Sequence, residues 1–484
     1  MSKRSLFILG LIVLASGALS FFTLTRGHLW WDDFASYVMQ AKSILSWTMD
    51  DFMRRNAFTV QNSSYPPGPV AYPWGFPLLL APVYAVFGLN PLALKLVSLA
   101  FYIVFLVAFY FLARTRLADT ESLLLTGVLS VLPALLAAND LIQSDIPFLA
   151  FSTLSLVLAD RFSRSAKSPD FALGFALGIT AFMAFFMRTT GILLLAPLGI
   201  SLLIASWPGW LAAIKKAIIP MLTFGILLVI QLALFPGGQE SYFSHFSMFT
   251  PQRLLDNALY YLWLPSWTFD QIPGGVVLYP ILAVFVLVSL FNHLRRDAAL
   301  HAYSLLTILL FIVWPERQGL RFIYPVLPFL FIAAFDGMKL VSARLKADWQ
   351  QPAQGIVSGF WGLILIVALI VSADSAYRNV AGGREINGPF DSYSNQMFSF
   401  IREKTPAKSI IIFMRPRALR LFTNHDSFMT ENCADLAKGD YVAIHEKMGD
   451  VGQIPPEQIT SCNSALRLDV VFNNKRFTVY KIQK

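Results

Sequence analysis

Long apolar segments separated by short polar connections make up most of the chain. The run from Leu6 to Leu24 holds no charged residue and is long enough to span a bilayer, which takes about 20 residues. Eleven predominantly apolar segments are predicted as transmembrane helices: 5–24, 92–113, 121–138, 145–160, 171–187, 190–206, 213–235, 276–292, 299–315, 320–338 and 355–373. The pattern therefore predicts an α-helical polytopic membrane protein.

The pattern changes in residues 374–484, which are polar. Short β-like runs fall at 409–413, 441–445, 466–472 and 477–482, and 394–403 favours a helix. The turn residues 473–476 predict a hairpin between the last two runs. We predict two domains, a membrane module at 1–373 and a small C-terminal α/β domain at 374–484.

Composition supports this class. The 484 residues are 56% hydrophobic and 14% charged, whereas soluble proteins are about 25% charged. The net charge of +9 would fit nucleic-acid binding in a soluble protein. Here the basic residues fall in alternate loops, as expected of cytoplasmic loops, so no nucleic acid is expected as a partner.

The positions of the basic residues predict the orientation. The loops predicted to be inside hold Lys3, Arg4, Arg114, Arg116, Arg161, Arg164, Lys167, Lys215, Lys216, Arg295, Arg296, Lys339, Arg344 and Lys346. The outer loop 139–144 holds none. We expect a bacterial plasma (inner) membrane protein with a cytoplasmic N-terminus and a retained signal-anchor. The outer loop 25–90 and the C-terminal domain are then extracytoplasmic.

The apolar stretch 75–88 contains Pro77 and Pro82. Counting it as a span would place every later basic cluster outside. We therefore predict an interfacial or re-entrant helix.

Four polar features share the predicted outer face. They are the acidic cluster after the first span, two acidic residues around the next outer loop, and two arginine-bearing segments: Asp32 with Asp33, Asp140 with Asp145, Arg188, and Arg317 with Arg321. Taken singly, the acids fit helix caps, and Arg317 and Arg321 fit snorkelling side chains. Arg188, at membrane depth, needs an anionic partner or a route to water. Together they form a set of carboxylates and guanidinium groups near lipid. A carboxylate can deprotonate a hydroxyl, and arginine forks can hold a phosphate.

At these residues the chain resembles the GT-C fold membrane glycosyltransferases. It is most similar to the bacterial protein O-mannosyltransferase and lipid A aminoarabinose transferase superfamily (glycosyltransferase families 39 and 83). The matching motifs are Trp31–Tyr37, Tyr72–Pro77, Asp145–Pro147, Arg188–Gly191 and Arg321–Pro328. A second stretch, Tyr65–Pro69, is similar to the Tyr72 motif. Asp33 stands where the family has Glu.

The resemblance implies an inverting transfer from a polyprenyl-phosphate sugar on the external face. Asp32 is the implied general base, with Asp33 as second choice. The implied substrate-binding residues are Asp145, Asp140, Arg188, Arg317, Arg321, Tyr324, Tyr72 and Tyr65. A divalent cation is an open alternative, with Asp33 and Asp145 as its ligands. Membrane lipid is a further expected partner.

Alternative interpretations remain. One is an O-antigen ligase or polymerase with a diphosphate-linked donor. Others are a lipid-linked sugar transporter or flippase and a scaffold with a sensor domain. Transporters often show repeated halves, and none is visible in the sequence. The acceptor is left open among lipopolysaccharide, another glycan, a lipid and a protein.

The chain has two cysteines, Cys433 and Cys462, and no CxxC pair. A zinc or redox motif is therefore not supported. In an oxidising compartment the two can form a disulfide, and two free thiols are the alternative.

Overall fold

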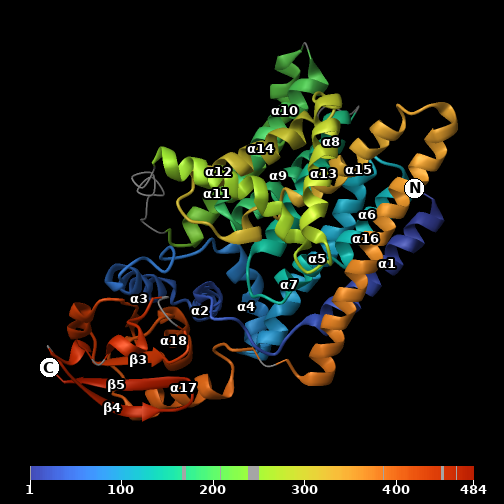
Figure 1. Cartoon of the computed structure of the whole chain (residues 1–484). Coiled ribbons are helices and arrows are strands. Elements are labelled where there is room, and N and C mark those ends of the chain that lie inside the picture. The colour runs from blue at the N-terminus through green and yellow to red at the C-terminus, as the bar shows by residue number, and fades with distance from the viewer. Residues whose placement is uncertain are drawn as a thin grey trace.

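The computed structural model describes residues 2–165, 170–207, 209–237, 250–384, 386–448, 452–459, 461–464 and 466–483. Long helices form a bundle, and a small sheet unit lies at one end of it (Figure 1). Helices α2 (Asp32–Ser46) and α3 (Met49–Asn62) lie between the bundle and the sheet unit.

Within the described ranges, seven helices are long and apolar enough to cross a membrane. They are α1 (Lys3–Thr23), α5 (Pro91–Ala113), α8 (Asp145–Arg164), the continuous pair η1 (Thr189–Leu194) and α10 (Leu195–Ser206), α11 (Trp210–Leu234), α13 (Gly275–Asn292) and α16 (Ala347–Gly382). The bent pair α6 (Asp119–Ser130) and α7 (Pro133–Asn139) makes an eighth if it counts as one span. The chain is a multi-pass membrane protein.

Each predicted span coincides with helical structure, although three helices are short for a bilayer. They are α9 (Phe171–Met187) with 17 residues, α14 (Ala298–Val313) with 16 and α15 (Leu327–Ser342) with 16. The predicted segment 320–338 begins as the short η4 (Gly319–Phe322), and α15 starts only where a proline can occupy its first turn. The eleven-span topology stays a prediction.

The helix bends by 56° between α6 and α7. Pro133 causes the bend, and other helices supply hydrogen-bond donors for the carbonyls that it leaves free. Pro133 lacks an N–H and its ring clashes with the preceding turn, so α6 ends before it. The freed carbonyls find donors on other helices: Tyr102 Oη donates to Leu129 O at 2.5 Å and Ser372 Oγ donates to Val131 O at 2.7 Å. Such partners are required because a buried carbonyl at membrane depth has no water to bind.

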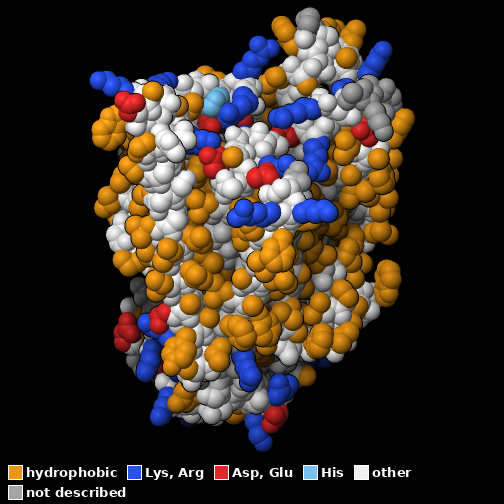
Figure 2. Space-filling model, turned by 90° about the vertical axis from the view of Figure 1, so that its right-hand side faces the viewer, with side chains coloured by type: hydrophobic (Ala, Val, Ile, Leu, Met, Phe, Trp, Pro, Cys, Tyr) orange, Lys and Arg blue, Asp and Glu red, His pale blue; other side chains and the backbone are white. Residues whose placement is uncertain are grey.

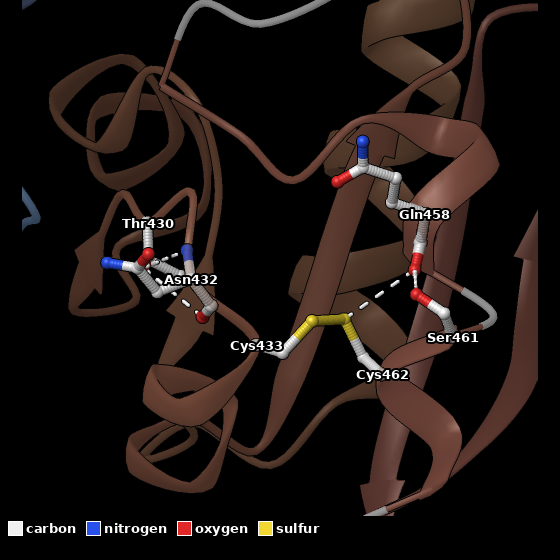
Figure 3. Close-up of a disulfide and its surroundings, with 6 residues drawn as sticks. All are labelled: Thr430, Asn432, Cys433, Gln458, Ser461 and Cys462. Carbon is white, nitrogen blue, oxygen red and sulfur yellow. Dashed lines mark hydrogen bonds between the residues drawn. A yellow bond between two sulfur atoms is a disulfide. The ribbon is translucent and has the colours of Figure 1, made fainter.

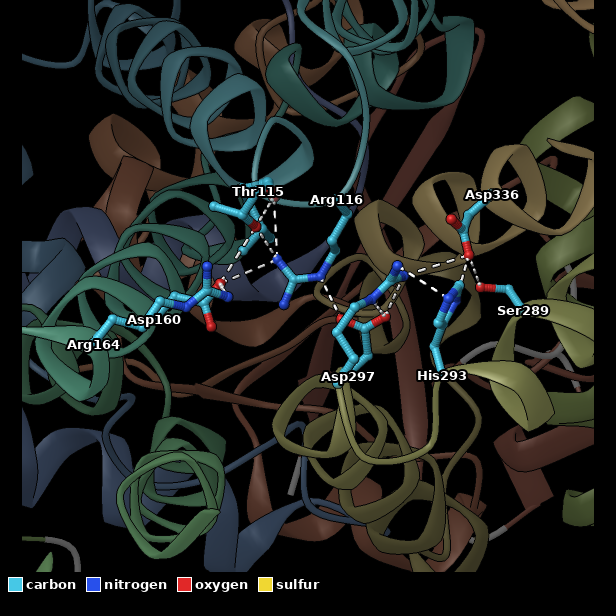
Figure 4. Close-up of polar contacts among 10 residues, drawn as sticks. Thr115, Arg116, Asp160, Arg164, Ser289, His293, Asp297 and Asp336 are labelled. Carbon is cyan, nitrogen blue, oxygen red and sulfur yellow. Dashed lines mark hydrogen bonds and ion pairs between the residues drawn. The ribbon is translucent and has the colours of Figure 1, made fainter. Parts of the chain in front are cut away.

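The loops predicted to be cytoplasmic share one end of the bundle. Arg116, after α5, pairs with Asp297 at 2.7 Å and with Asp160 of α8 at 3.2 Å. Arg296 continues the cluster to Asp336 of α15 at 3.4 Å (Figure 4). Figure 2 shows a broad apolar band with charged side chains gathered at the two ends of the molecule.

The predicted outer loop folds into helices. Helix α4 (Gly75–Phe87) has 13 residues and packs against α2 and α5, so it is too short to cross a bilayer. Gly75 is needed there, because a Cβ at this position would lie 2.4 Å from Phe186 O of α9. Helix α12 (Pro251–Trp263) and η3 (Leu264–Phe269) precede α13.

The C-terminal unit is a five-stranded mixed sheet with the order β2-β1-β3-β5-β4. Its strands are β1 (Ile411–Ile412), β2 (Ser427–Phe428), β3 (Tyr441–His445), β4 (Arg467–Asn473) and β5 (Phe477–Gln483). β1 runs parallel to β2 and β3, whereas β5 runs antiparallel to β3 and β4. The predicted β4–β5 hairpin is confirmed, with Asn473 opposite Thr478.

Helices complete the sheet unit. The predicted helix at 394–403 is α17 (Ser392–Lys404). Helix α18 (Pro416–Thr423), η5 (Cys433–Lys438), α19 (Pro456–Ile459) and η6 (Ser461–Ser464) were not predicted. Cys433 and Cys462 form a disulfide between η5 and η6 (Figure 3). Helix α16 continues to Gly382, and the division into domains at 373/374 stays a prediction.

Candidate functional site

A chain of alternating carboxylates and guanidinium groups lies at the end of the bundle nearest the sheet unit. Arg321 Nη1 donates to Asp33 Oδ2 at 3.0 Å and Arg321 Nε donates to Asp145 Oδ2 at 3.1 Å. Arg188 donates to the other oxygen of Asp145. The structure thus brings together four residues that the sequence analysis selected, from α2, η4, α8 and the end of α9.

This row of charged side chains is largely shielded from solvent. The side chain of Asp145 is 3% exposed, that of Arg321 13% and that of Asp33 19%. Charges with so little access to water are costly unless each is paired and hydrogen-bonded, and the alternation of sign meets that requirement. The snorkelling alternative therefore does not describe Arg321, and Arg188 has the anionic partner that was expected.

The capping alternative is wrong for these acids on their own helices. Helix α8 has Ser144 at its N-cap, without a side-chain cap bond. Both carboxylate oxygens of Asp145 accept hydrogen bonds from arginines. Helix α2 has Trp31 at its N-cap, also without a cap bond. Asp145 still gains from its place in the first turn of α8, where the helix dipole favours a negative charge.

Aromatic side chains enclose the ionic chain. Tyr72 Oη donates to Asp33 Oδ1 at 2.6 Å, and its ring centroid lies 4.8 Å from that of Tyr37. The Arg321 guanidinium carbon lies 5.7 Å from the ring centroid of Trp31, within cation–π range. Tyr37 was not selected from the sequence, although its place in the Trp31–Tyr37 motif was a signal for it.

Asp32 points to a different part of the molecule. Its Oδ1 accepts hydrogen bonds from the backbone N–H groups of Arg417 at 3.1 Å and Ala418 at 3.2 Å, in the first turn of α18. Its Oδ2 is buried without a hydrogen-bond partner, 3.8 Å from Arg417 Nε. Asp32 therefore connects the outer loop to the sheet unit and keeps one oxygen uncommitted.

The two neighbouring carboxyls have pKa values shifted in opposite directions. Burial raises the pKa of Asp32 above its ordinary value, and the positive charge of Arg417 offsets this only in part. Burial also acts on Asp33, but the Arg321 guanidinium and the Tyr72 hydroxyl outweigh it and lower the pKa of Asp33. Asp33 is held as a carboxylate, whereas Asp32 binds a proton more readily.

Trp30 belongs to the core of the sheet unit. Its side chain is 4% exposed and packs edge-on against Phe413 at 5.7 Å and Phe477 at 6.0 Å, inside the sheet unit. The ring anchors the segment that carries the two aspartates. Since Trp is amphipathic, a protein core with an acceptor for its N–H is an equally good environment, and Asn387 Oδ1 accepts that bond at 3.3 Å.

Asp140 belongs to a different cluster. Its Oδ1 accepts from Thr25 N and from Lys95 Nζ, each at 2.7 Å. Lys95 Nζ also donates to the carbonyls of Thr25 and Gly27. This buried pair ties the start of the outer loop to α5. Lys95 was missed as a partner, although a lysine inside an apolar span is itself a signal.

Three other predicted binding residues have partners outside the ionic chain. Arg317 Nε donates to Asn257 Oδ1 of α12 at 2.8 Å, and its guanidinium carbon lies 5.0 Å from the ring centroid of Tyr260. Tyr324 Oη lies 3.5 Å from Ala134 O of α7. Tyr65 lies against the sheet unit, since a Cβ on Gly452 would be 3.2 Å from its hydroxyl.

The site does not provide a complete set of metal ligands. Asp33 and Asp145 were the expected ligands of a divalent cation, but the positive charge between them is the Arg321 guanidinium. In the part of the chain that the structure describes, no three His, Cys, Asp or Glu side chains are grouped as metal ligands.

The bundle contains an apolar cavity of about 360 Å³. It is lined by residues of α12, α13, α14 and α15, and also by Ile323, two positions after Arg321.

Comparison with known structures identifies the fold. ArnT from Cupriavidus metallidurans, bound to undecaprenyl phosphate, superposes with a TM-score of 0.60 at 14% identity over 97% of each chain. Archaeoglobus fulgidus oligosaccharyltransferase AglB, in complex with an inhibitory peptide and a dolichol-phosphate, gives 0.53 at 13% identity over 92% of this chain and 70% of that one. Mycobacterial arabinofuranosyltransferase AftD gives 0.50 at 12% identity over 99% and 42%.

The chain has the GT-C fold of membrane glycosyltransferases, as the resemblance implied. At sequence identities of 12% to 14%, these similarities show the fold alone. No protein-family model and no curated protein sequence matches the chain.

Proposed function

We propose that this protein is a membrane glycosyltransferase that moves a sugar from a polyprenyl-phosphate donor to the hydroxyl of an extracytoplasmic acceptor. The observation that carries the proposal is the Asp33–Arg321–Asp145–Arg188 chain with Asp32 beside it. The fold is shared with ArnT bound to undecaprenyl phosphate and with AglB bound to dolichol-phosphate, which supports a lipid-linked donor.

The arginines are suited to the donor phosphate. Each pairs with a carboxylate in the structure, so an incoming phosphate would compete for Arg321 and Arg188 as an alternative anion. A guanidinium fork matches the oxygens of a phosphate as well as those of a carboxylate. As the leaving group gains charge, these two groups stabilise it.

Asp32 is suited to act as general base. Its Oδ1 is held by two backbone amides, while Oδ2 keeps free lone pairs. A base works best when its pKa is not far below the working pH, and the shift at Asp32 has that direction. Asp33 is the weaker choice because both its oxygens are bonded and its pKa is lowered.

The proposed step follows from these roles. Asp32 Oδ2 takes the proton of the acceptor hydroxyl, and the oxygen attacks the anomeric carbon of the sugar. The bond from that carbon to the phosphate oxygen breaks, and the electron pair leaves with polyprenyl phosphate. Attack opposite the leaving group inverts the anomeric configuration. The products are the glycosylated acceptor and a protonated Asp32.

The donor is held in the bilayer and the acceptor is in water, which supports a site at the membrane boundary. A polyprenyl tail is held in the bilayer by about 0.8 kcal/mol for each methylene, whereas a polar acceptor resists entry. In this proposal the apolar cavity that Ile323 lines takes the first isoprene units, and the phosphate binds Arg321. The acceptor then arrives under the sheet unit.

The test is release of free polyprenyl phosphate. The full chain in lipid nanodiscs is incubated with a panel of polyprenyl-phosphate sugars and a cell-envelope glycan extract, and the lipid product is quantified. Release that depends on both substrates supports the proposal. Release only from diphosphate-linked donors, or movement of intact donor across a vesicle membrane without cleavage, contradicts it.

A further inference from the structure

The sheet unit supplies contacts to Asp32 from a distance of 385 residues along the chain. The first turn of a helix has N–H groups with no partner inside the helix. In α18 two of these, at Arg417 and Ala418, donate to Asp32 Oδ1. The carboxylate of α2 thus serves as the acceptor that the N-terminus of α18 requires.

The Arg417 side chain strengthens this junction. It is fully buried. Its guanidinium donates to Asn56 Oδ1 at 3.2 Å, Pro67 O at 3.0 Å and Pro69 O at 2.5 Å. The same guanidinium lies 5.7 Å from the ring of Tyr72, whose hydroxyl binds Asp33.

A guanidinium buried this completely is costly unless it is paired and hydrogen-bonded, and Arg417 finds its hydrogen-bond acceptors outside the sheet unit. Three of its acceptors belong to the outer loop, and the nearest carboxylate is Asp32. Arg417 therefore orders the loop segment 67–72 and faces the free oxygen of Asp32 at once.

We propose that Arg417 is a positioning residue: through it, the sheet unit orients Asp32 and sets the charge around it for proton transfer. This deepens the proposed function and rests on it. The C-terminal unit would then take part in the chemistry indirectly and would not serve only for acceptor recognition.

The charged groups around Asp32 come from three segments. Arg417 and Arg420 lie on α18, Arg415 precedes that helix, and Asp33 is the neighbour on α2. Arg417 is the largest of the influences that keep the pKa of Asp32 from rising further with burial. Removing this positive charge should raise that pKa, because the carboxylate loses its nearest counter-charge.

The experiment uses Arg417→Gln in the full chain. Infrared difference spectra between proteins with Asp32 and with Asp32→Asn report protonation of this carboxyl as pH is varied. We expect the Asp32 titration to move upward by about one pH unit or more. In transfer assays the pH at which kcat/KM falls on the acid side should move upward by the same amount. At pH values below this point kcat/KM should be about tenfold lower than in the wild type. The donor KM should change little.

Arg420→Gln is the matched control. Arg420 lies on the same helix, is 4% exposed and donates to Asn56 Oδ1 at 2.9 Å. It forms no ion pair with Asp32 in the described structure, whereas Arg417 Nε lies 3.8 Å from Asp32 Oδ2. Arg420→Gln should lower thermal stability to a similar degree and shift the Asp32 titration clearly less. If Arg417→Gln does not fold, Arg417→Lys replaces it; this variant keeps the charge, loses the fork and should give an intermediate shift.

The outcomes separate the two proposals. An Asp32 titration that is unchanged in both Arg417 variants, or that moves equally in Arg420→Gln, overturns the positioning role whatever the activity. If no polyprenyl-phosphate sugar is cleaved, the proposed function fails, while the infrared titration still decides whether Arg417 controls Asp32.

Discussion

At the scale of single residues, two adjacent carboxylates have separate partners because they lie on a helix. Consecutive helical residues do not share a face, so Asp32 points to α18 and Asp33 to Arg321. Both oxygens of Asp33 accept hydrogen bonds, whereas Oδ2 of Asp32 has no hydrogen-bond partner. The pair can therefore divide two roles, a proton acceptor and a charged support for the arginine.

Asp32→Asn should abolish most transfer. The amide keeps the shape but cannot accept the proton, so kcat should fall by about 10²–10⁴. Because the pKa of Asp32 is raised, the ionised base exists only at higher pH, and wild-type kcat/KM should fall on the acid side at a pH above the ordinary value of about 3.9. Steady-state kinetics across pH checks both points.

The control for this substitution is Asp51→Asn on α3, where the aspartate side chain is 50% exposed and pairs only with Arg54. It should retain wild-type kinetics. Near-normal turnover in well-folded Asp32→Asn protein would remove Asp32 from the role of base.

Arg321→Lys should weaken donor binding. Lysine keeps the charge but cannot bridge Asp33 and Asp145 or fork onto a phosphate. The loss of one charged hydrogen bond, about 1.5 kcal/mol, corresponds to a rise in donor Kd of about tenfold. Titration with a fluorescent polyprenyl phosphate measures this. The exposed Arg54→Lys on α3 serves as control, and equal affinities in both variants would count against a donor site at Arg321.

At the scale of elements, the sheet unit depends on a short sheet, two flanking helices and one disulfide. β1 and β2 have two residues each, so the parallel edge offers few ladder bonds. The Cys433–Cys462 bridge closes a loop with a sequence separation of 29 beside this edge. A cross-link of this length restricts the unfolded chain considerably.

The double substitution Cys433→Ser and Cys462→Ser should destabilise the sheet unit by about 3 kcal/mol, the loss of chain restriction expected for a loop of this size. Denaturant unfolding followed by hydrogen–deuterium exchange in peptides of the sheet unit measures the change. A reducing agent should lower the stability of the wild type and leave the double variant unaffected. Equal stability of the oxidised wild type and the variant would contradict the expectation.

At the scale of the whole molecule, contacts sort the polar residues onto two ends of the bundle. Arg116, Asp297 and Arg296 gather at one end. Asp33, Asp145 and Arg321 gather at the other, with the sheet unit. An apolar band separates the ends (Figure 2). The positive-inside rule then predicts that the sheet unit is extracytoplasmic.

Cysteine labelling in intact cells tests this orientation. The described cysteines are both in the disulfide, so an added thiol is a clean probe. Lys475→Cys, in the β4–β5 turn, should react with an impermeant maleimide in cells whose outer barrier alone is opened. Lys346→Cys, before α16, should react only after the inner membrane is permeabilised. The reverse pattern would invert the topology.

The sequence by itself determined the apolar segments, the hairpin and the selection of Asp33, Asp145, Arg188 and Arg321. These features follow from local composition, because a bilayer-length apolar run or a turn motif is complete within a few residues. The apolar pattern also determined the class of protein. The number of spans does not follow from the apolar pattern alone, since α9, α14 and α15 are short for a bilayer.

Only the tertiary structure decided which charged groups pair. Arg321 meets Asp33 across 288 positions, and Arg417 meets Asp32 across 385. Nothing in the local sequence marks such partners, because an ion pair depends on the folded path of the chain and not on the residues beside it. The same cause explains why Asp140 was grouped with the site when its partner is Lys95, and why α18, whose first turn holds Asp32, was not foreseen.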